Sequence, residues 1–197
     1  MNFSWTRLAD GNIRIHIKTP VVEIGTLYRL TAAIFTMGLD IVSGDIKTFI
    51  KDGESYSDDE FILRQSDQSI SEGEISAKLG IMMEAILRDH TDPDEFMKVE
   101  NIQPPRKLEF FDVEPVIVFQ SDDKTNTTQF HIEAPNRTGL LFHLTRILAR
   151  ENIDIIKAAI RTEGDYLAQD TFFLQCNGRK LEKETAERLE REIASYE

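Results

Sequence analysis

The polar residues best placed to bind a ligand lie in a short loop that leads from a strand-like run into a helix-like run. Helix N-termini present unpaired backbone N–H groups and the positive end of the helix dipole, and both attract a carboxylate. Gly139 lets the backbone approach a ligand closely, Arg137 can pair with a carboxylate, and Asn136 can accept a hydrogen bond from an amino group. The predicted ligand-binding residues are Asn136, Arg137, Thr138, Gly139, Leu140 and Leu141.

The same pattern stands earlier in the chain. The heptapeptide GTLYRLT, which begins at Gly25, aligns without a gap with GLLFHLT, which begins at Gly139. The register continues through Asp40 and Asp154, for which we expect turn or junction roles rather than ligand contact. A repeat of this length indicates two copies of one small domain. The elements that position the ligand-binding loop should therefore occur twice.

The two loops differ in charge. The first copy carries Glu23, Ile24 and Gly25 at the corresponding place, without the Asn-Arg pair. A ligand carboxylate would meet repulsion from Glu23. The first site is therefore inactive, specific for another ligand, or only a pairing surface, and the sequence leaves these alternatives open.

Each copy has the hydrophobic periodicity of a strand, a helix, two strands and a second helix. Alternating Ile13, Ile15 and Ile17 predict a half-buried strand, and Leu27 to Met37 have helical spacing. In the first copy we expect strands over 12–18, 39–50 and 60–65, and helices over 27–37 and from 71. In the second copy we expect strands over 128–133, 153–162 and 168–176, and helices from 140 and from 181. The charged segment 52–60 is expected to be a solvated, flexible loop.

Adding a closing strand to this order gives a ferredoxin-like βαββαβ unit, an antiparallel sheet with helices on one face. The expected fold class is thus α+β, with two such domains in tandem. We place domain 1 at 1–90, a proline-containing linker at 91–106 and domain 2 at 107–197. The apolar runs Lys107–Phe111 and Val116–Gln120 are candidates for the additional strands, and the sequence does not decide which sheet each one closes.

The second loop and helix, followed by Asn152-Ile153-Asp154-Ile155, resemble the ACT domain. The likeness is greatest to the ACT repeats at the C-terminal end of the PII-uridylyltransferase family, in which this loop usually reads Asp-Arg-Pro-Gly-Leu-Leu. Here Asn136 and Thr138 replace the usual Asp and Pro, which leaves the identity of the ligand open. The resemblance implies allosteric regulation by a small ligand, commonly an amino acid, bound near the loop or at the seam between paired domains. It also implies side-by-side pairing, either within the chain or in a homodimer.

Composition excludes several other classes. The net charge of −12 argues against nucleic acid as a partner, because binding a polyanion rests on Lys and Arg contacts. No run is long enough to span a membrane, the first residues do not resemble a signal peptide, and the lone Cys176 suits a reducing cytoplasm. The four histidines have no metal-ligand spacing, and no cofactor motif or catalytic constellation is present.

The sequence therefore predicts a cytoplasmic, non-enzymatic regulatory protein. We expect it to bind a small effector, an amino acid, and to pass the signal to a partner that the sequence does not name. The alternative is a ligand-independent module for dimerisation or protein–protein interaction, which the altered first loop favours.

Overall fold

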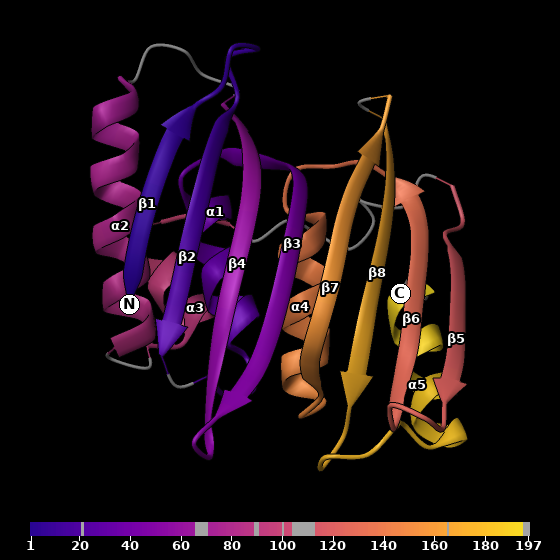
Figure 1. Ribbon diagram of the computed structural model, residues 1–197. Coiled ribbons are helices and arrows are strands. Elements are labelled where there is room, and N and C mark those ends of the chain that lie inside the picture. The colour runs from indigo at the N-terminus through magenta and orange to yellow at the C-terminus, as the bar shows by residue number, and fades with distance from the viewer. Residues whose placement is uncertain are drawn as a thin grey trace.

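A single antiparallel sheet of eight strands runs through the protein, with the helices packed on one face (Figure 1). The computed structural model describes residues 1–20, 22–65, 71–88, 91–99, 101–103, 113–164 and 166–194. The strand order across the sheet is β1-β2-β4-β3-β7-β8-β6-β5. The first four strands belong to the first repeat and the last four to the second, so the sheet is continuous from one copy to the other.

The repeats contain corresponding elements in the same order. The first comprises β1 (Asn2–Arg7), β2 (Ile13–Pro20), α1 (Thr26–Thr36), β3 (Leu39–Lys51), β4 (Glu54–Gln65) and α2 (Glu72–Arg88). The second comprises β5 (Val116–Asp122), β6 (Thr127–Pro135), α4 (Leu140–Arg150), β7 (Asp154–Glu163), β8 (Leu167–Gln175) and α5 (Lys183–Ala194). The helix α3 (Pro93–Val99) lies between them. This arrangement confirms the expected tandem α+β fold.

The strand that closes each half-sheet comes before the repeat rather than after it. β1 pairs with β2, and β5 pairs with β6, each in antiparallel register along its full length. The order in each half is therefore ββαββα, with the outer edge occupied by the preceding strand in place of the final strand of βαββαβ. The expected run at Val116–Gln120 is thus β5, whereas the run at Lys107–Phe111 lies outside the described residues.

Two segments differ from the sequence-based expectations. The segment 52–60 is not a solvated loop, because β4 begins at Glu54 and turns Ser57 and Asp59 into the interior, where they are 4% and 1% exposed. The connector at 91–106 contains α3, which begins at Pro93 directly after the capping residue Asp92. Proline suits this first helical position because its missing N–H would have no partner there.

The repeats meet along a seam with approximate twofold symmetry. At the centre of the β3–β7 ladder, Asp45 pairs with its repeat equivalent Ala159. Below the sheet α1 contacts α4, and the hydroxyls of the equivalent residues Thr31 and Thr145 lie 2.9 Å apart in a buried hydrogen bond. Most buried apolar residues of both repeats form one continuous core, which therefore extends across the seam, and Tyr28, Ala32, Met97 and Phe142 form a smaller second cluster among the helices.

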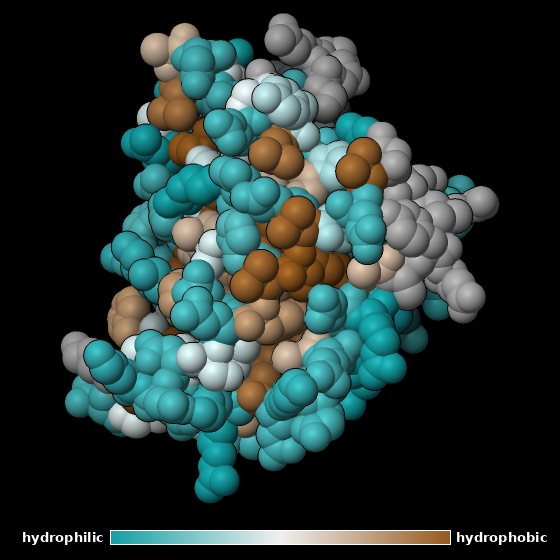
Figure 2. Space-filling view, turned by 90° about the vertical axis from the view of Figure 1, so that its right-hand side faces the viewer, coloured by the Kyte–Doolittle hydropathy of each residue, from teal (hydrophilic) through white to brown (hydrophobic). Residues whose placement is uncertain are grey.

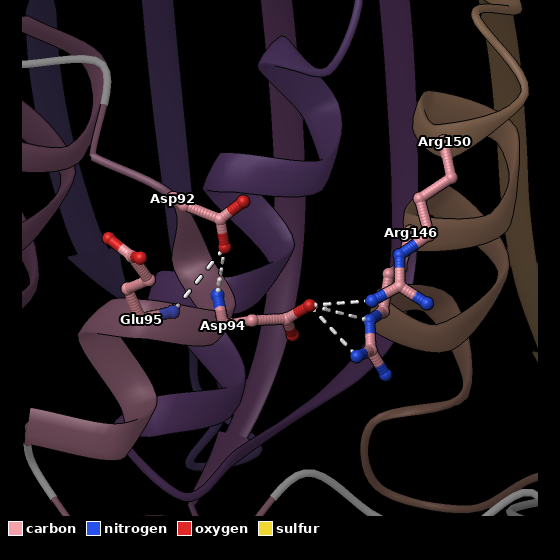
Figure 3. Close-up of polar contacts among 5 residues, drawn as sticks. All are labelled: Asp92, Asp94, Glu95, Arg146 and Arg150. Carbon is pink, nitrogen blue, oxygen red and sulfur yellow. Dashed lines mark hydrogen bonds and ion pairs between the residues drawn. The ribbon is translucent and has the colours of Figure 1, made fainter.

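The connector helix α3 is tied to the second repeat by charge (Figure 3). Asp92 caps α3 by accepting hydrogen bonds from the backbone amides of Asp94 and Glu95 at 2.8 and 3.3 Å. Asp94 Oδ2 in turn accepts hydrogen bonds from Arg146 Nη2 at 2.8 Å and from Arg150 Nη2 at 2.9 Å. Because both arginines lie on α4, these contacts fix α3 across the helix layer near the seam.

Among the described residues, no helix has both the length and the apolar character needed to cross a bilayer.

Candidate functional site

Two pockets lie at the seam, and they correspond to one another under the twofold relation of the repeats. Each is formed by the loop and first helical turn of one repeat together with the helix–strand junction of the other. The Arg137 pocket combines the loop before α4 with Asp40 at the start of β3. The Glu23 pocket combines the loop before α1 with Asp154 at the start of β7. Both repeats therefore contribute to each pocket.

Most of the residues predicted to bind a ligand line these pockets. The Arg137 pocket is lined by five of its six predicted residues, Asn136, Arg137, Gly139, Leu140 and Leu141. The Glu23 pocket is lined by Glu23 and Gly25. Thr138 and Ile24 are not among the lining residues. Whether any of these residues contacts a ligand stays a prediction.

The two glycines give both loops the same shape. Gly25 and Gly139 precede their helices with φ of 88° and 89°, a left-handed conformation that other residues rarely adopt. The amide of Leu140 donates to the carbonyl of Arg137 at 3.0 Å, and Thr26 donates to Glu23 in the same way. Replacing either glycine would therefore strain a turn that sets the wall of a pocket.

Buried aspartates, which the sequence analysis did not identify, line the inner wall of both pockets. Asp170 of β8 faces the Arg137 pocket, and Asp59 of β4 faces the Glu23 pocket. They are repeat equivalents, because Asp59 pairs with Ile46 on β3 and Asp170 lies at the same place beside β7. Burial raises the pKa of Asp170 to about 7 and that of Asp59 to about 6. Each pocket thus contains a carboxyl group that can change charge near neutral pH.

The two aspartates differ in their hydrogen bonds. Asp170 Oδ1 accepts a hydrogen bond from the backbone amide of Arg161 at 3.3 Å. Asp59 Oδ2 accepts one from the Ser57 hydroxyl at 2.7 Å, which partly offsets the rise of its pKa. The Lys47 amide also lowers that pKa, yet Asp59 Oδ1 is buried and accepts no hydrogen bond of normal geometry from any described residue.

The junction aspartates add further negative charge. Asp154 lines the Glu23 pocket, where burial raises its pKa and the backbone amide of Ile155 partly offsets the effect. Asp40 occupies the equivalent place in the Arg137 pocket. The Arg137 pocket thus contains both signs of charge, from Arg137 on one hand and from Asp40 and Asp170 on the other. In contrast, the other pocket is lined by the acidic side chains Glu23, Asp59 and Asp154, and the described part of its lining contains no lysine, arginine or histidine.

Both pockets are narrow. The walls of each stand so close that there is room for roughly one water molecule. An amino acid therefore needs the walls to separate. Aromatic packing between the helices lies beside the pockets, since the rings of Tyr28 and its repeat equivalent Phe142 are stacked with centroids 5.5 Å apart.

No group of three or more histidine, cysteine, aspartate or glutamate side chains within the described ranges is arranged to hold a metal ion.

Comparison with known proteins identifies the second repeat. Residues 129–194 match the model of the ACT domain family. Over 93% of its length the chain is 27% identical to the bifunctional uridylyltransferase/uridylyl-removing enzyme of Nitrosococcus oceani, and over 86% it is 29% identical to that of Cereibacter sphaeroides. It spans only about a fifth of the length of these relatives, 21% and 18% respectively.

A solved structure supports the same fold. The aspartate kinase from Synechocystis superposes with a TM-score of 0.50 at 14% identity, covering 93% of this chain and 26% of that one. At this level of identity the likeness concerns the fold. Residues 129–194 thus form an ACT domain, and the chain as a whole is similar to part of the bifunctional uridylyltransferase/uridylyl-removing enzymes.

Proposed function

We propose that this protein is a regulatory module without catalytic activity of its own, and that it binds a free amino acid in the Arg137 pocket. The observation that carries the proposal is the placing of opposite charges across that pocket. Arg137 and the N-terminal end of α4 contribute positive charge to the pocket, while Asp40 at the start of β3 and Asp170 inside β8 contribute negative charge. The carboxylate of an amino acid can pair with Arg137 and the helix end, and its ammonium group can pair with the two aspartates.

The position of the pocket supports a regulatory role. A ligand there touches α4 and its loop in one repeat and the α1–β3 junction in the other. Because the closed pocket has room for only about one water molecule, binding requires the two repeats or their loops to separate slightly. A ligand shifts a conformational equilibrium by as much as its affinities for the two states differ. The amino acid therefore favours an open seam, which a partner protein can distinguish from the closed one.

Calorimetric titration with the twenty amino acids tests this proposal. We expect at least one to bind the unaltered protein and to bind at least about tenfold more weakly to Arg137→Ala. Arg29→Ala is a matched control, because Arg29 lies beside the Glu23 pocket without lining either one. Circular dichroism should give both variants the melting profile of the parent protein. Silence across the panel, or equal loss in both variants, contradicts the proposal.

A ligand-independent interaction module is the second candidate, and one surface favours it. The outer strand β5 exposes Val116 and Val118, which are 55% and 48% exposed. The side of the molecule that carries β5 and α5 has an apolar patch at its centre, bordered by polar side chains (Figure 2). Edge strands with apolar side chains are prone to pair with other chains. A silent amino-acid panel together with a stable oligomer in analytical ultracentrifugation would select this candidate.

A further inference from the structure

The connector helix α3 packs against helices of both repeats at once. Its residue Met97 is 0% exposed and belongs to a cluster with Tyr28 and Ala32 of α1 and Phe142 of α4. Phe35 of α1 packs against the same cluster. Since α1 is part of the first repeat and α4 part of the second, α3 lies over the place where the two repeats meet in the helix layer.

The aromatic residues beneath α3 are also walls of the two seam pockets. Phe35 and Phe142 line the Arg137 pocket, and Tyr28 lines the Glu23 pocket. The three rings form one stack, with centroids 5.3 Å apart between Phe35 and Phe142 and 5.5 Å apart between Tyr28 and Phe142. Protein interiors are close-packed, so a ring in such a stack does not move without its neighbours. Widening either pocket on this side therefore disturbs the surface on which Met97 rests.

Asp94 adds an electrostatic hold at the same place (Figure 3). Its Oδ2 accepts hydrogen bonds from Arg146 Nε at 3.1 Å and Nη2 at 2.8 Å, and from Arg150 Nη2 at 2.9 Å, both arginines being on α4. The side chains of Asp94 and Arg146 are only 18% and 21% exposed, so solvent and salt screen this pair less than a surface pair. On the side of α1, burial and the nearby Asp94 carboxylate raise the pKa of the Tyr28 hydroxyl. One carboxyl group is thus held between helices of both repeats.

We propose that α3 is a latch that keeps both seam pockets closed, and that Asp94 has to leave Arg146 before either pocket widens. Contacts made only in the closed state lower the population of the open state. The apparent affinity for a ligand that needs the open state falls in proportion to that population. The latch therefore sets the ligand concentration to which the module responds. It rests on the proposed function only for the identity of that ligand, because closing and opening are properties of the ligand-free chain.

Thiol labelling of the ligand-free full chain measures the opening. Cys176 is the only cysteine, so Cys176→Ser gives a background without a thiol. Thr31 lines the Arg137 pocket and Thr145 the Glu23 pocket, and each is 1% exposed. Thr31→Cys and Thr145→Cys in this background each carry a thiol that a reagent reaches after opening. We expect Asp94→Ala to accelerate the labelling of both by at least about tenfold, because charge-assisted hydrogen bonds of the closed state are lost. An unchanged rate at either thiol would overturn the proposal.

A core substitution away from α3 is the matched control. Ile193 of α5 is 0% exposed and belongs to the main core rather than to the cluster around Met97. Ile193→Val lowers the stability of the whole chain but removes no contact of the latch, so it should leave both labelling rates unchanged. If Ile193→Val accelerates labelling as much as Asp94→Ala does, the thiols are reached by global unfolding and the latch is refuted.

The amino-acid titration is read separately, without the cysteine substitutions. The amino acid that binds the parent protein should bind Asp94→Ala more tightly, by a factor similar to the acceleration of labelling. Affinity that fails to rise would refute the control of binding by α3. A silent amino-acid panel together with accelerated labelling would contradict the proposed function and support the latch.

Discussion

Replacing Asp59 by asparagine should make the ligand-free protein more stable at pH 8. Burial raises the pKa of Asp59 from 3.8 to about 6. Since one pKa unit corresponds to about 1.4 kcal/mol, keeping the ionised carboxylate in the interior costs about 3 kcal/mol. Asparagine carries no charge, so it removes the cost of burying the carboxylate. Its amide group would have no hydrogen-bond partner at the place of Oδ1, which costs about 1 kcal/mol. The net expectation is a gain of about 2 kcal/mol in the free energy of unfolding.

The gain should depend on pH in a defined direction. Because the pKa of Asp59 is higher in the folded than in the unfolded chain, its contribution to stability is present below about pH 4 and is lost as the pH rises through about 6. The difference between Asp59→Asn and the parent protein should therefore be near zero or slightly negative at about pH 4, and full at about pH 8. Urea unfolding followed by circular dichroism at several pH values measures it.

The neighbouring residue provides a control of opposite sign. Asp58 points to the other face of the sheet, where a hydrogen bond from His16 lowers the pKa of its carboxyl group. Asp58→Asn should consequently lower the stability at pH 7. If Asp59→Asn destabilises the protein at pH 8, or if its effect is independent of pH, the cost assigned to burial is wrong.

Two further pairs of variants test the packing. Arg146→Ala should lower the free energy of unfolding by about 1–3 kcal/mol in urea titration, because Arg146 donates two hydrogen bonds to the connector helix from a half-buried position. Arg150 is more exposed, so Arg150→Ala should change the free energy of unfolding by less than about 1 kcal/mol. Equal effects of the two substitutions would contradict the role of Arg146. Gly44→Ala should destabilise by about 1–3 kcal/mol, since a Cβ there would lie 2.8 Å from the fully buried ring of Phe61. Gly73→Ala, in a helix and with open space around the added carbon, should stabilise by up to about 1 kcal/mol, and thermal unfolding of both variants distinguishes the two signs.

The repeat made the fold predictable, because it allowed a weak pattern in one copy to be read with the help of the other. Alternation and helical spacing located β2, α1 and their equivalents within a few residues. The first half of β4 was not predicted as a strand, because its inward positions hold Ser57 and Asp59 instead of apolar residues. The helix α3 was missed in favour of a connector, although Asp92-Pro93 is a helix start signal that could have been used.

The pockets were predictable only in part. The glycine and polar loop identified one wall, since helix N-termini have a recognisable sequence. The opposite walls depend on which strands lie beside the seam, and this follows from the pairing of β3 with β7. Asp59 and Asp170 are also 111 residues apart, whereas Gly25 and Gly139 are 114 apart, because the β3–β4 hairpin of the first copy is longer. An alignment of the two copies at a constant offset of 114 therefore did not pair these two aspartates.

Joining both copies in one polypeptide has a consequence for how their seam can evolve. In a homodimer the symmetry operator makes the two seam sites identical, so any substitution alters both. Here Arg137 and Glu23 occupy equivalent places and have opposite charges. The covalent connection also makes the β3–β7 contact independent of protein concentration, because the partner is always present on the same chain. Dilution in the cell leaves this pairing intact, and the two halves are free to specialise.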